Sequence, residues 1–320
     1  MKPSTSPTPL PHDAEIANFA DRLDAAIARK QSCLVVGLDP IEERLPPEIR
    51  GASLAAGRGP RGWTARAATA VGLFLERVID AIAPFAVAVK PNAGFFERFG
   101  AVGWECLRRV CEIAHDRELL VILDAKRGDI GSTADAYCEA LLGDTPDTVG
   151  PLTDALTLNP YLGRDSIEPY LARVRDAGKG LFVLVRTSNP SAREIQELDV
   201  GGEPLFVHVA RRVAAWSAGL DGTSGLGPVG AVVGATAPGQ AVRVRSELPR
   251  AMFLVPGYGA QGAGADELRP FFLPGGRGAV VNASRSVLYA FEGGGRDWLA
   301  AVADAARRAR DDLEAVRRTC

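Results

Sequence analysis

Two aspartates and a lysine lie close together near the middle of the chain, directly after an apolar run. Residues 119–123 are Leu-Leu-Val-Ile-Leu, and Asp124, Lys126 and Asp129 follow within the next six positions. A short run of branched apolar residues is typical of a buried strand. Because side chains alternate along a strand, Asp124 and Lys126 are expected to point to the same side. A carboxylate beside an ammonium group keeps that group charged, and a positioned ammonium can deliver a proton.

A purely structural interpretation of this cluster is an ion-paired strand end in which Asp129 caps the next helix. Gly128 allows the chain to turn after the strand. Ser132, Thr133 and the residues up to 142 are then predicted to form a capped helix. An Asp-x-Lys motif alone fits both interpretations. In parallel α/β folds, however, the edge where a strand leads into a helix is where ligands bind.

A second candidate site lies in the last quarter of the chain. The string Pro-Gly-Tyr-Gly-Ala-Gln-Gly-Ala-Gly has glycines at positions 257, 259, 262 and 264. Such a loop can turn backbone N–H groups towards an anion without steric hindrance. Arg285 follows in Asn-Ala-Ser-Arg-Ser and can form two parallel hydrogen bonds with a phosphate. The two segments together predict a phosphate site, which barrels often place after their last two strands.

The elements that must position these residues alternate between strand and helix. Eight apolar runs predict strands at residues 33–38, 85–89, 119–123, 155–158, 181–185, 229–233, 252–255 and 279–281. Helical spacing predicts helices at residues 13–31, 65–82, 103–116, 132–142, 166–176, 203–218, 238–246 and 296–318. Alternating strands and helices indicate a parallel sheet. Eight such units predict an α/β fold of the (β/α)8 TIM-barrel type, with an open doubly wound sheet as the alternative.

The domain organisation follows from the same pattern. Residues 1–12 are Pro- and Ser-rich and are predicted to form a flexible N-terminal arm. Residues 13–320 are predicted to form a single catalytic barrel domain. Residues 41–63 are predicted to be irregular, and residues 51–63 to be a flexible insertion.

Composition excludes several classes of protein. The chain has 37 basic and 39 acidic residues, and no basic excess points to nucleic acid. The five cysteines are odd in number and have no Cys-x-x-Cys spacing, so we expect reduced thiols in a cytoplasmic protein. The three histidines form no metal-ligand pattern, so no metal is expected. From the Pro- and Ser-rich first residues we expect no secretory signal, and there is no apolar run of the ~20 residues that a membrane span needs.

The string Asp-Ala-Lys-Arg-Gly-Asp-Ile-Gly-Ser-Thr-Ala, residues 124–134, resembles the signature of orotidine 5'-phosphate decarboxylases, specifically the long-chain bacterial branch, type 2. The resemblance extends to residues 37–40, 88–92, 186–190, 256–262 and 282–286. It does not cover the first dozen residues or the 51–63 insertion. The resemblance implies a carboxy-lyase that converts orotidine 5'-monophosphate to UMP and carbon dioxide in de novo pyrimidine biosynthesis, without a cofactor.

The resemblance also assigns roles to individual residues. The implied catalytic residues, around the carbon that loses carbon dioxide, are Lys90, Asp124, Lys126 and Asp129, with Lys126 as electrostatic stabiliser and general acid. The implied substrate-binding residues are Asp39 at the ribose, Ser188 at the pyrimidine, Gln261 and Arg285 at the 5'-phosphate, and Thr133. Asp129 and Thr133 are implied to reach the partner subunit's site, which predicts a homodimer with shared active sites.

Three other functions remain open from the residues. A hexulose-phosphate-synthase-like barrel enzyme also uses Asp-x-Lys-x-x-Asp and would need a divalent metal. A Schiff-base aldolase would use Lys90 or Lys126 as its nucleophile. A non-catalytic nucleotide-binding protein would need only the phosphate site. The segments at residues 186–190 and 256–262 favour the decarboxylase over all three.

Overall fold

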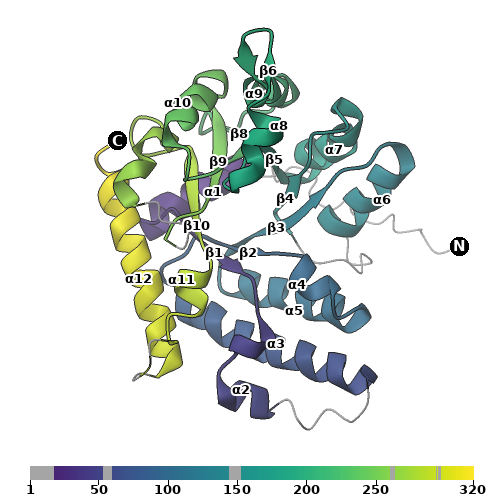
Figure 1. Cartoon of the computed structure of the whole chain (residues 1–320), viewed down its shortest axis with the longest axis vertical. Helices are drawn as coiled ribbons and strands as arrows, with labels where there is room; N and C mark the ends of the chain where they lie inside the picture. The colour runs from purple at the N-terminus through teal and green to yellow at the C-terminus, as the bar shows by residue number, and fades with distance from the viewer. Residues whose placement is uncertain (1–17, 53–59, 144–152, 260–263, 293, 295–296) are drawn as a thin grey trace, which may run out of the picture.

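The computed structural model of the protein describes residues 18–52, 60–143, 153–259, 264–292, 294 and 297–320 (Figure 1). Eight parallel strands form a closed barrel in the order β1, β10, β9, β8, β5, β4, β3, β2. Their bounds are β1 (Leu34–Leu38), β2 (Ala88–Pro91), β3 (Leu120–Arg127), β4 (Ala155–Leu158), β5 (Gly180–Arg186), β8 (Gly227–Val233), β9 (Ala251–Pro256) and β10 (Ala279–Ala283). The (β/α)8 prediction is confirmed, and the open sheet is excluded because β10 pairs with β1.

Helices surround the barrel on its outside, as Figure 1 shows. They are α1 (Phe19–Lys30), α2 (Pro47–Ala52), α3 (Pro60–Ile82), α4 (Gly94–Glu97), α5 (Ala101–Asp116), α6 (Gly131–Leu142), α7 (Glu168–Ala177), α8 (Arg193–Gln196), α9 (Leu205–Ser217), α10 (Pro238–Glu247), α11 (Arg285–Leu288) and α12 (Trp298–Arg317). Between α8 and α9, the strands β6 (Asp199–Val200) and β7 (Glu203–Pro204) form a small antiparallel hairpin. The hairpin and α8 were not predicted, because such short elements show no detectable periodicity.

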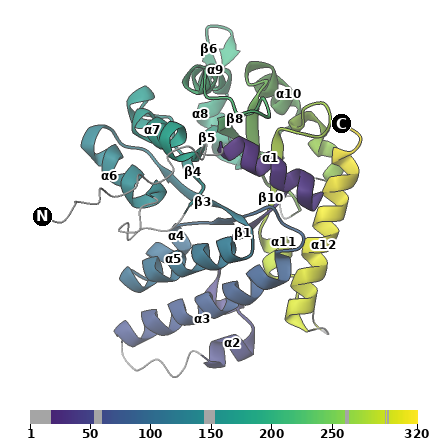
Figure 2. The same ribbon diagram turned by 180° about the vertical axis from the view of Figure 1, so that it is seen from behind.

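The interior of the barrel is an apolar core that α1 closes from one end. Alternate strand residues point inward and pack together, among them Val35, Ala88, Ile122, Ala155, Phe182, Met252 and Val280. Phe19 of α1 packs edge-on against Phe182, with ring centroids 5.9 Å apart. Figure 2 shows α1 crossing this end of the barrel. The N-terminal ends of the strands are therefore covered, which leaves the C-terminal ends for a ligand.

Two strands extend further than predicted. β3 continues to Arg127 and β2 continues to Pro91, although β2 begins only at Ala88, so Lys90, Asp124 and Lys126, expected just beyond these strands, lie within them. The pairing of β3 with β4 shifts register between Leu123 and Arg127. Inside this irregular stretch Lys126 has a φ of 48°. Charged side chains fit within these strands because the barrel interior opens to its mouth at this level.

The region predicted to be irregular contains helices. Residues 42–44 form a 3-10 turn, α2 ends at Ala52 and α3 begins at Pro60. Proline is favoured in the first turn of a helix, where its missing N–H costs no hydrogen bond. Residues 53–59, the arm at 1–12 and the first residues of the predicted N-terminal helix lie outside the described residues. No helix in the described ranges is long and apolar enough to cross a membrane.

Candidate active site

A cavity of about 350 Å³ opens at the C-terminal end of the barrel. Its lining residues come from β2, β3, β4, β5, β8, β9, the loop after β5 and α8: Lys90, Asp124, Lys126, Thr157, Leu184, Thr187, Ser188, Asn189, Gln196, Val232, Leu254 and Pro256. The charged residues belong to β2 and β3, whereas β5, β8 and β9 contribute leucine, valine and proline. The cavity therefore has one ionic side and one apolar side, as expected for a ligand that carries both kinds of surface.

Asp124 lies between the two lysines on the ionic side. Lys90 Nζ is 2.6 Å from Asp124 Oδ2, and Lys126 Nζ forms an ion pair with Oδ1. Burial alone would raise the pKa of Asp124, but the charges of Lys90 and Lys126 and their hydrogen bonds hold that pKa well below its usual range. Burial alone would lower the pKa of Lys90, but the charges of Asp124 and Asp39 raise it. The cluster therefore holds the Asp124 carboxylate and the charged Lys90 ammonium group at neutral pH.

The two lysines differ in exposure. The side chain of Lys90 is 6% exposed, whereas that of Lys126 is 46% exposed. An ammonium group has three N–H donors. Within the described residues, Lys126 Nζ has Asp124 as its hydrogen-bond partner, so further donors remain for a ligand in the cavity.

Asp39 follows β1 at the edge of the same site. Its Oδ1 is buried and has no hydrogen-bond partner among the described residues. Its backbone oxygen accepts a hydrogen bond from the Tyr289 hydroxyl at 3.1 Å, which fixes the backbone at this point. A buried acceptor without a partner costs free energy unless a ligand or water satisfies it. The carboxylate of Asp39 is therefore available to a hydroxyl donor.

Ser188, which the family resemblance implied as a substrate-binding residue, lies in the loop after β5 and lines the cavity. A Cβ atom on Gly234 would come within 2.7 Å of Ser188 Cα, so glycine is required for this close approach. Gln196, which was not predicted, holds the loop from the other side. Its Oε1 accepts from the Thr187 N–H at 2.9 Å, and its Nε2 donates to Thr187 Oγ1 at 2.8 Å. The loop that carries Ser188 is thus fixed by α8.

The predicted phosphate site is described in part. Arg285 begins α11 and is exposed, and its guanidinium group has no hydrogen-bond or ion-pair partner among the described residues. Gly259, in the loop after β9, has a φ of 77°, and a Cβ there would lie 3.2 Å from Ser286 Oγ. The glycine loop and the start of α11 therefore meet, as the phosphate prediction requires. Gln261 lies outside the described residues.

Asp129 and Thr133 do not reach the cavity of their own subunit, and neither is among its lining residues. Asp129 Oδ1 accepts a hydrogen bond from the Ile130 N–H at 2.9 Å. α6 begins at Gly131 with Ile130 as its N-cap and no side-chain capping bond, so the predicted capping by Ser132 and Thr133 is wrong. The left-handed conformation of Gly131, with a φ of 54°, forms the turn into the helix instead.

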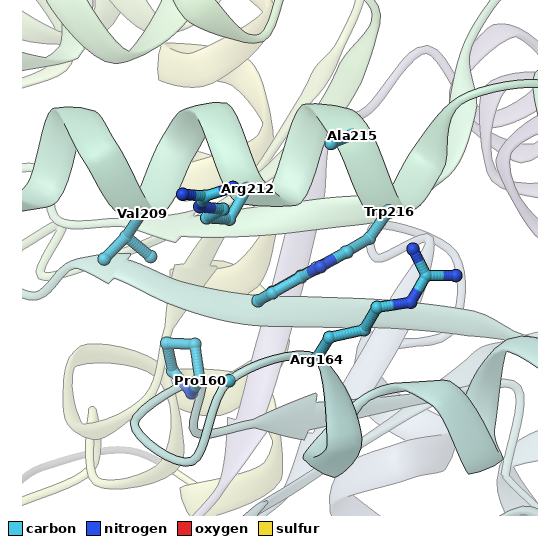
Figure 3. Close-up of a pocket in the computed structure, with 7 residues that line it drawn as sticks. Pro160, Arg164, Val209, Arg212, Ala215 and Trp216 are labelled. Carbon is cyan, nitrogen blue, oxygen red and sulfur yellow. The ribbon is translucent and has the colours of Figure 1, made fainter.

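A second hollow of about 360 Å³ lies outside the barrel, between the β4–α7 connection and α9 (Figure 3). Its lining residues are Pro160, Gly163, Arg164, Val209, Arg212, Ala215 and Trp216. In Figure 3 the indole of Trp216 extends from α9 towards the loop that carries Pro160. This hollow contains no carboxylate and none of the predicted site residues. The mouth of the barrel is therefore the candidate active site.

Comparison with known proteins agrees with this choice. Residues 34–292 match a family model described as "Orotidine 5'-phosphate decarboxylase / HUMPS family". A Rhodopirellula baltica protein named orotidine 5'-phosphate decarboxylase is 45% identical over 85% of this chain and 88% of the relative. One of the same name from Caldicellulosiruptor bescii is 40% identical over 86% and 90%. The structure of Leishmania donovani OMP decarboxylase has a TM-score of 0.70 and 33% identity over 94% of this chain and 98% of that one.

The match to the family model extends over the whole barrel and includes every strand that lines the cavity. The family description joins the decarboxylases to the HUMPS proteins, but both relatives and the solved structure carry the decarboxylase name. The match, the closed barrel and the lysine–aspartate cluster at its mouth lead to the same conclusion. The chain belongs to the orotidine 5'-phosphate decarboxylase family.

Proposed function

We propose that the lysine–aspartate cluster is the catalytic centre in which orotidine 5'-monophosphate loses carbon dioxide to give UMP. The observation that carries the proposal is that the Lys126 side chain is half-exposed, pairs with Asp124 and lines the cavity. Loss of carbon dioxide from C6 of the pyrimidine breaks the bond between C6 and the carboxylate carbon and leaves the electron pair on C6. A fixed ammonium stabilises this charge and then supplies the proton.

Each member of the cluster has a separate task in this scheme. Lys126 donates a proton from Nζ to C6 and is reprotonated by solvent after the product leaves. Asp124 keeps Lys90 charged and orients both lysines, since each of its oxygens pairs with one ammonium group. Lys90 holds the other oxygen of Asp124 and is too buried to exchange with solvent readily. The scheme uses no metal ion and no organic cofactor.

The rest of the cavity fits a nucleotide. Leu184, Val232 and Leu254 offer an apolar surface for the faces of a pyrimidine ring. Ser188 is proposed to bind the amide edge of that ring, because it lines the same cavity on a fixed loop. These contacts orient C6 towards the ionic side of the cavity.

The ribose and the phosphate are proposed to bind at the edge of the cavity. Asp39 has an unpartnered buried oxygen that suits a ribose hydroxyl. Arg285 and Gln261 are proposed to bind the 5'-phosphate with backbone N–H groups of the neighbouring loops. Binding energy from this remote group can offset the free-energy cost of ordering the reacting ring.

We further propose a homodimer in which Asp129 and Thr133 complete the partner's active site. Both residues lie where β3 leads into α6, and neither lines the cavity of its own subunit. Large apolar side chains are exposed nearby: Ile130 is 51% exposed, and Tyr161, in the β4–α7 connection that packs beside α6, is 84% exposed. If these side chains form one contiguous apolar patch, that patch would suit an association surface. A two-fold contact would bring the same patch of each subunit together and place Asp129 opposite a partner's site.

The five free cysteines support a reducing location, and we propose that the enzyme acts in the cytoplasm. Burial raises the pKa of Cys106 to about 12 and that of Cys138 to about 11, so these thiols are protonated and unreactive at neutral pH. They are structural residues rather than nucleophiles.

The proposed reaction is tested by following the ultraviolet absorbance of orotidine 5'-monophosphate with purified protein and excess chelator. We expect full decarboxylation in chelator. Activity that vanishes with chelator and returns with magnesium would support the hexulose-phosphate-synthase-like alternative. Borohydride trapping of a substrate adduct on Lys126 would support a Schiff-base aldolase instead. Nucleotide binding without turnover would indicate a non-catalytic binding protein.

A further inference from the structure

Thr157 is the residue of β4 that lines the active-site cavity, and both hydrogen-bonding directions of its hydroxyl are fixed. Its Oγ1 lies 3.0 Å from Asp124 Oδ1 and 3.0 Å from the backbone nitrogen of Lys126. The Asp124 carboxylate can only accept, and a peptide N–H can only donate. The hydroxyl therefore donates its single proton to Asp124 and accepts a hydrogen bond from Lys126. One buried group joins the carboxylate to the backbone of the proposed proton donor.

The backbone of Lys126 needs such a partner because β3 is irregular at this point. Leu123 pairs with Leu156 and Arg127 with Leu158, so three residues of β3 lie opposite Thr157 alone. Lys126 itself adopts a φ of 48°, a left-handed conformation that costs a non-glycine residue about 1–2 kcal/mol. The Thr157 hydroxyl takes the place of the regular strand partner for the Lys126 N–H.

We propose that Thr157 is a positioning residue that holds Lys126 and Asp124 in the geometry required for proton delivery to the substrate. The inference rests on the proposed role of Lys126 as proton donor. Without the hydroxyl, the Lys126 N–H would lack its partner and Asp124 would lose one of the donors that fix its orientation. The irregular segment could then relax away from its left-handed conformation, and the ammonium group would move with it. A displacement of about 1 Å at a reacting group can cost on the order of 100-fold in rate.

The test replaces the hydroxyl while keeping the shape of the side chain. Thr157→Val has the same branched form and fits the same buried position. We expect kcat for decarboxylation to fall by about 10- to 100-fold. We expect KM to change little, because the phosphate, ribose and apolar contacts remain. Thr157→Ser keeps the hydroxyl and is expected to restore most of kcat. A role limited to packing would give the opposite order, because serine leaves a cavity where valine does not.

A matched control separates turnover from stability. Thr153 is also buried, and its hydroxyl donates to the backbone oxygen of Leu141 at the other end of β4. Thr153→Val is expected to lower the melting temperature without changing kcat. Thr157→Ala serves as a second hydroxyl-free variant if Thr157→Val does not fold.

The possible outcomes are distinct. Wild-type kcat in a folded Thr157→Val or Thr157→Ala protein would overturn the inference and leave the proposed reaction intact. A Thr157→Ser protein no faster than Thr157→Val would overturn it as well. A wild-type protein that does not decarboxylate the substrate would overturn both.

Discussion

Each end of the barrel holds a buried aspartate that pairs with two basic side chains. Asp124, at the C-terminal mouth, pairs with Lys90 and Lys126. Asp154, at the N-terminal end, pairs with Arg22 at 2.6 Å and His115 at 2.9 Å. Burial alone would raise the pKa of Asp154, but the hydrogen bond from His115 and the charge of Arg22 lower that pKa to about 2. The two aspartates are thus similar in burial and in having a lowered pKa.

The two aspartates differ in whether one of their basic partners is accessible to a ligand. Arg22 is held by α1 and also donates to the backbone oxygen of Gly178 at 3.1 Å, and Asp154 itself accepts from the Val121 N–H at 2.8 Å. The partners of Asp154 are thus fixed between α1, α5 and β3. At the mouth, Lys126 is half exposed and lines a cavity. A buried ion-paired aspartate is therefore not in itself a sign of catalysis, and the accessible donor beside it is the distinguishing feature.

The strongest test of this difference is to replace one residue in each cluster and compare turnover. Lys126→Ala is expected to lower kcat by about 10⁴-fold, because it removes both the charge at C6 and the proton donor. Asp154→Asn is expected to leave kcat unchanged, because Asp154 contacts no cavity residue of the active site. Initial rates from ultraviolet absorbance measure both. A similar loss of turnover in the two variants would mean that the two ends of the barrel are coupled.

The cluster of Lys90, Asp124 and Lys126 at the mouth is also proposed to need Asp129 from a second subunit. No such need is proposed for the N-terminal cluster of Asp154, Arg22 and His115. Lys126→Ala and Asp129→Ala should each nearly abolish turnover alone. In mixed dimers, one site would carry both changes and the other neither. Statistical subunit exchange should therefore restore about one quarter of wild-type activity if the sites act independently.

Mass spectrometry establishes whether exchange has occurred. Complete exchange without recovered activity would contradict the shared site and confine Asp129 to its contact with Ile130 in its own subunit.

Exposed arginines at the two ends provide a third comparison. Arg285→Ala is expected to raise KM for the phosphorylated substrate by about 10- to 100-fold, the value of one or two charge-assisted hydrogen bonds. The penalty should largely disappear for the nucleoside without phosphate. Arg250, which pairs with Asp221 at 3.1 Å at the N-terminal end, is the matched control, and Arg250→Ala should leave KM unchanged. If Arg285→Ala raised KM equally for both substrates, Arg285 would be structural.

The smallest expected effect is the pH dependence of the contribution that Asp154 and its partners make to the free energy of unfolding. The folded-state pKa of Asp154, about 2, lies below its unfolded value, so protonation favours unfolding. The ion pair therefore contributes about 2 kcal/mol to the free energy of unfolding above pH ~4, and this contribution is lost as pH falls from about 4 to about 2.

Urea unfolding of wild-type protein and Asp154→Asn at several pH values measures this contribution. The difference in unfolding free energy between the two proteins should shrink over that pH range. A difference that stays constant from pH 7 to pH 2 would show that the charge of Asp154 is not responsible.

Much of the fold and part of the site could be predicted from local patterns. The eight strands follow from apolar runs, and the pairing of Asp124 with Lys126 follows from alternation along one strand. The assignment of Lys90 and Ser188 to one site came from the family resemblance; both line the same cavity, and their roles there remain predictions. The roles of Asp129, Thr133 and Gln261 remain predictions, the first two because they require a second subunit.

The residues that sequence reasoning missed are brought to their sites by contacts between elements. Thr157 is the polar member of an apolar strand, and only the register shift between β3 and β4 places its hydroxyl against Lys126. Asp154 precedes the same strand, and its partners lie 132 and 39 residues away in the chain. Gln196 lies on a short helix that shows no pattern of its own.

By itself, the sequence determined the order of strands and helices and the spacing of side chains within each of them. These depend on backbone geometry over a few residues, which repeats along every strand and helix. Tertiary structure alone decided which strands are neighbours, where their register shifts, and which of two similar aspartates faces an open cavity. Those properties depend on closure of the barrel between β1 and β10 and on the position of α1 across its other end. Closure and packing arise from the whole chain at once, so no local segment encodes them.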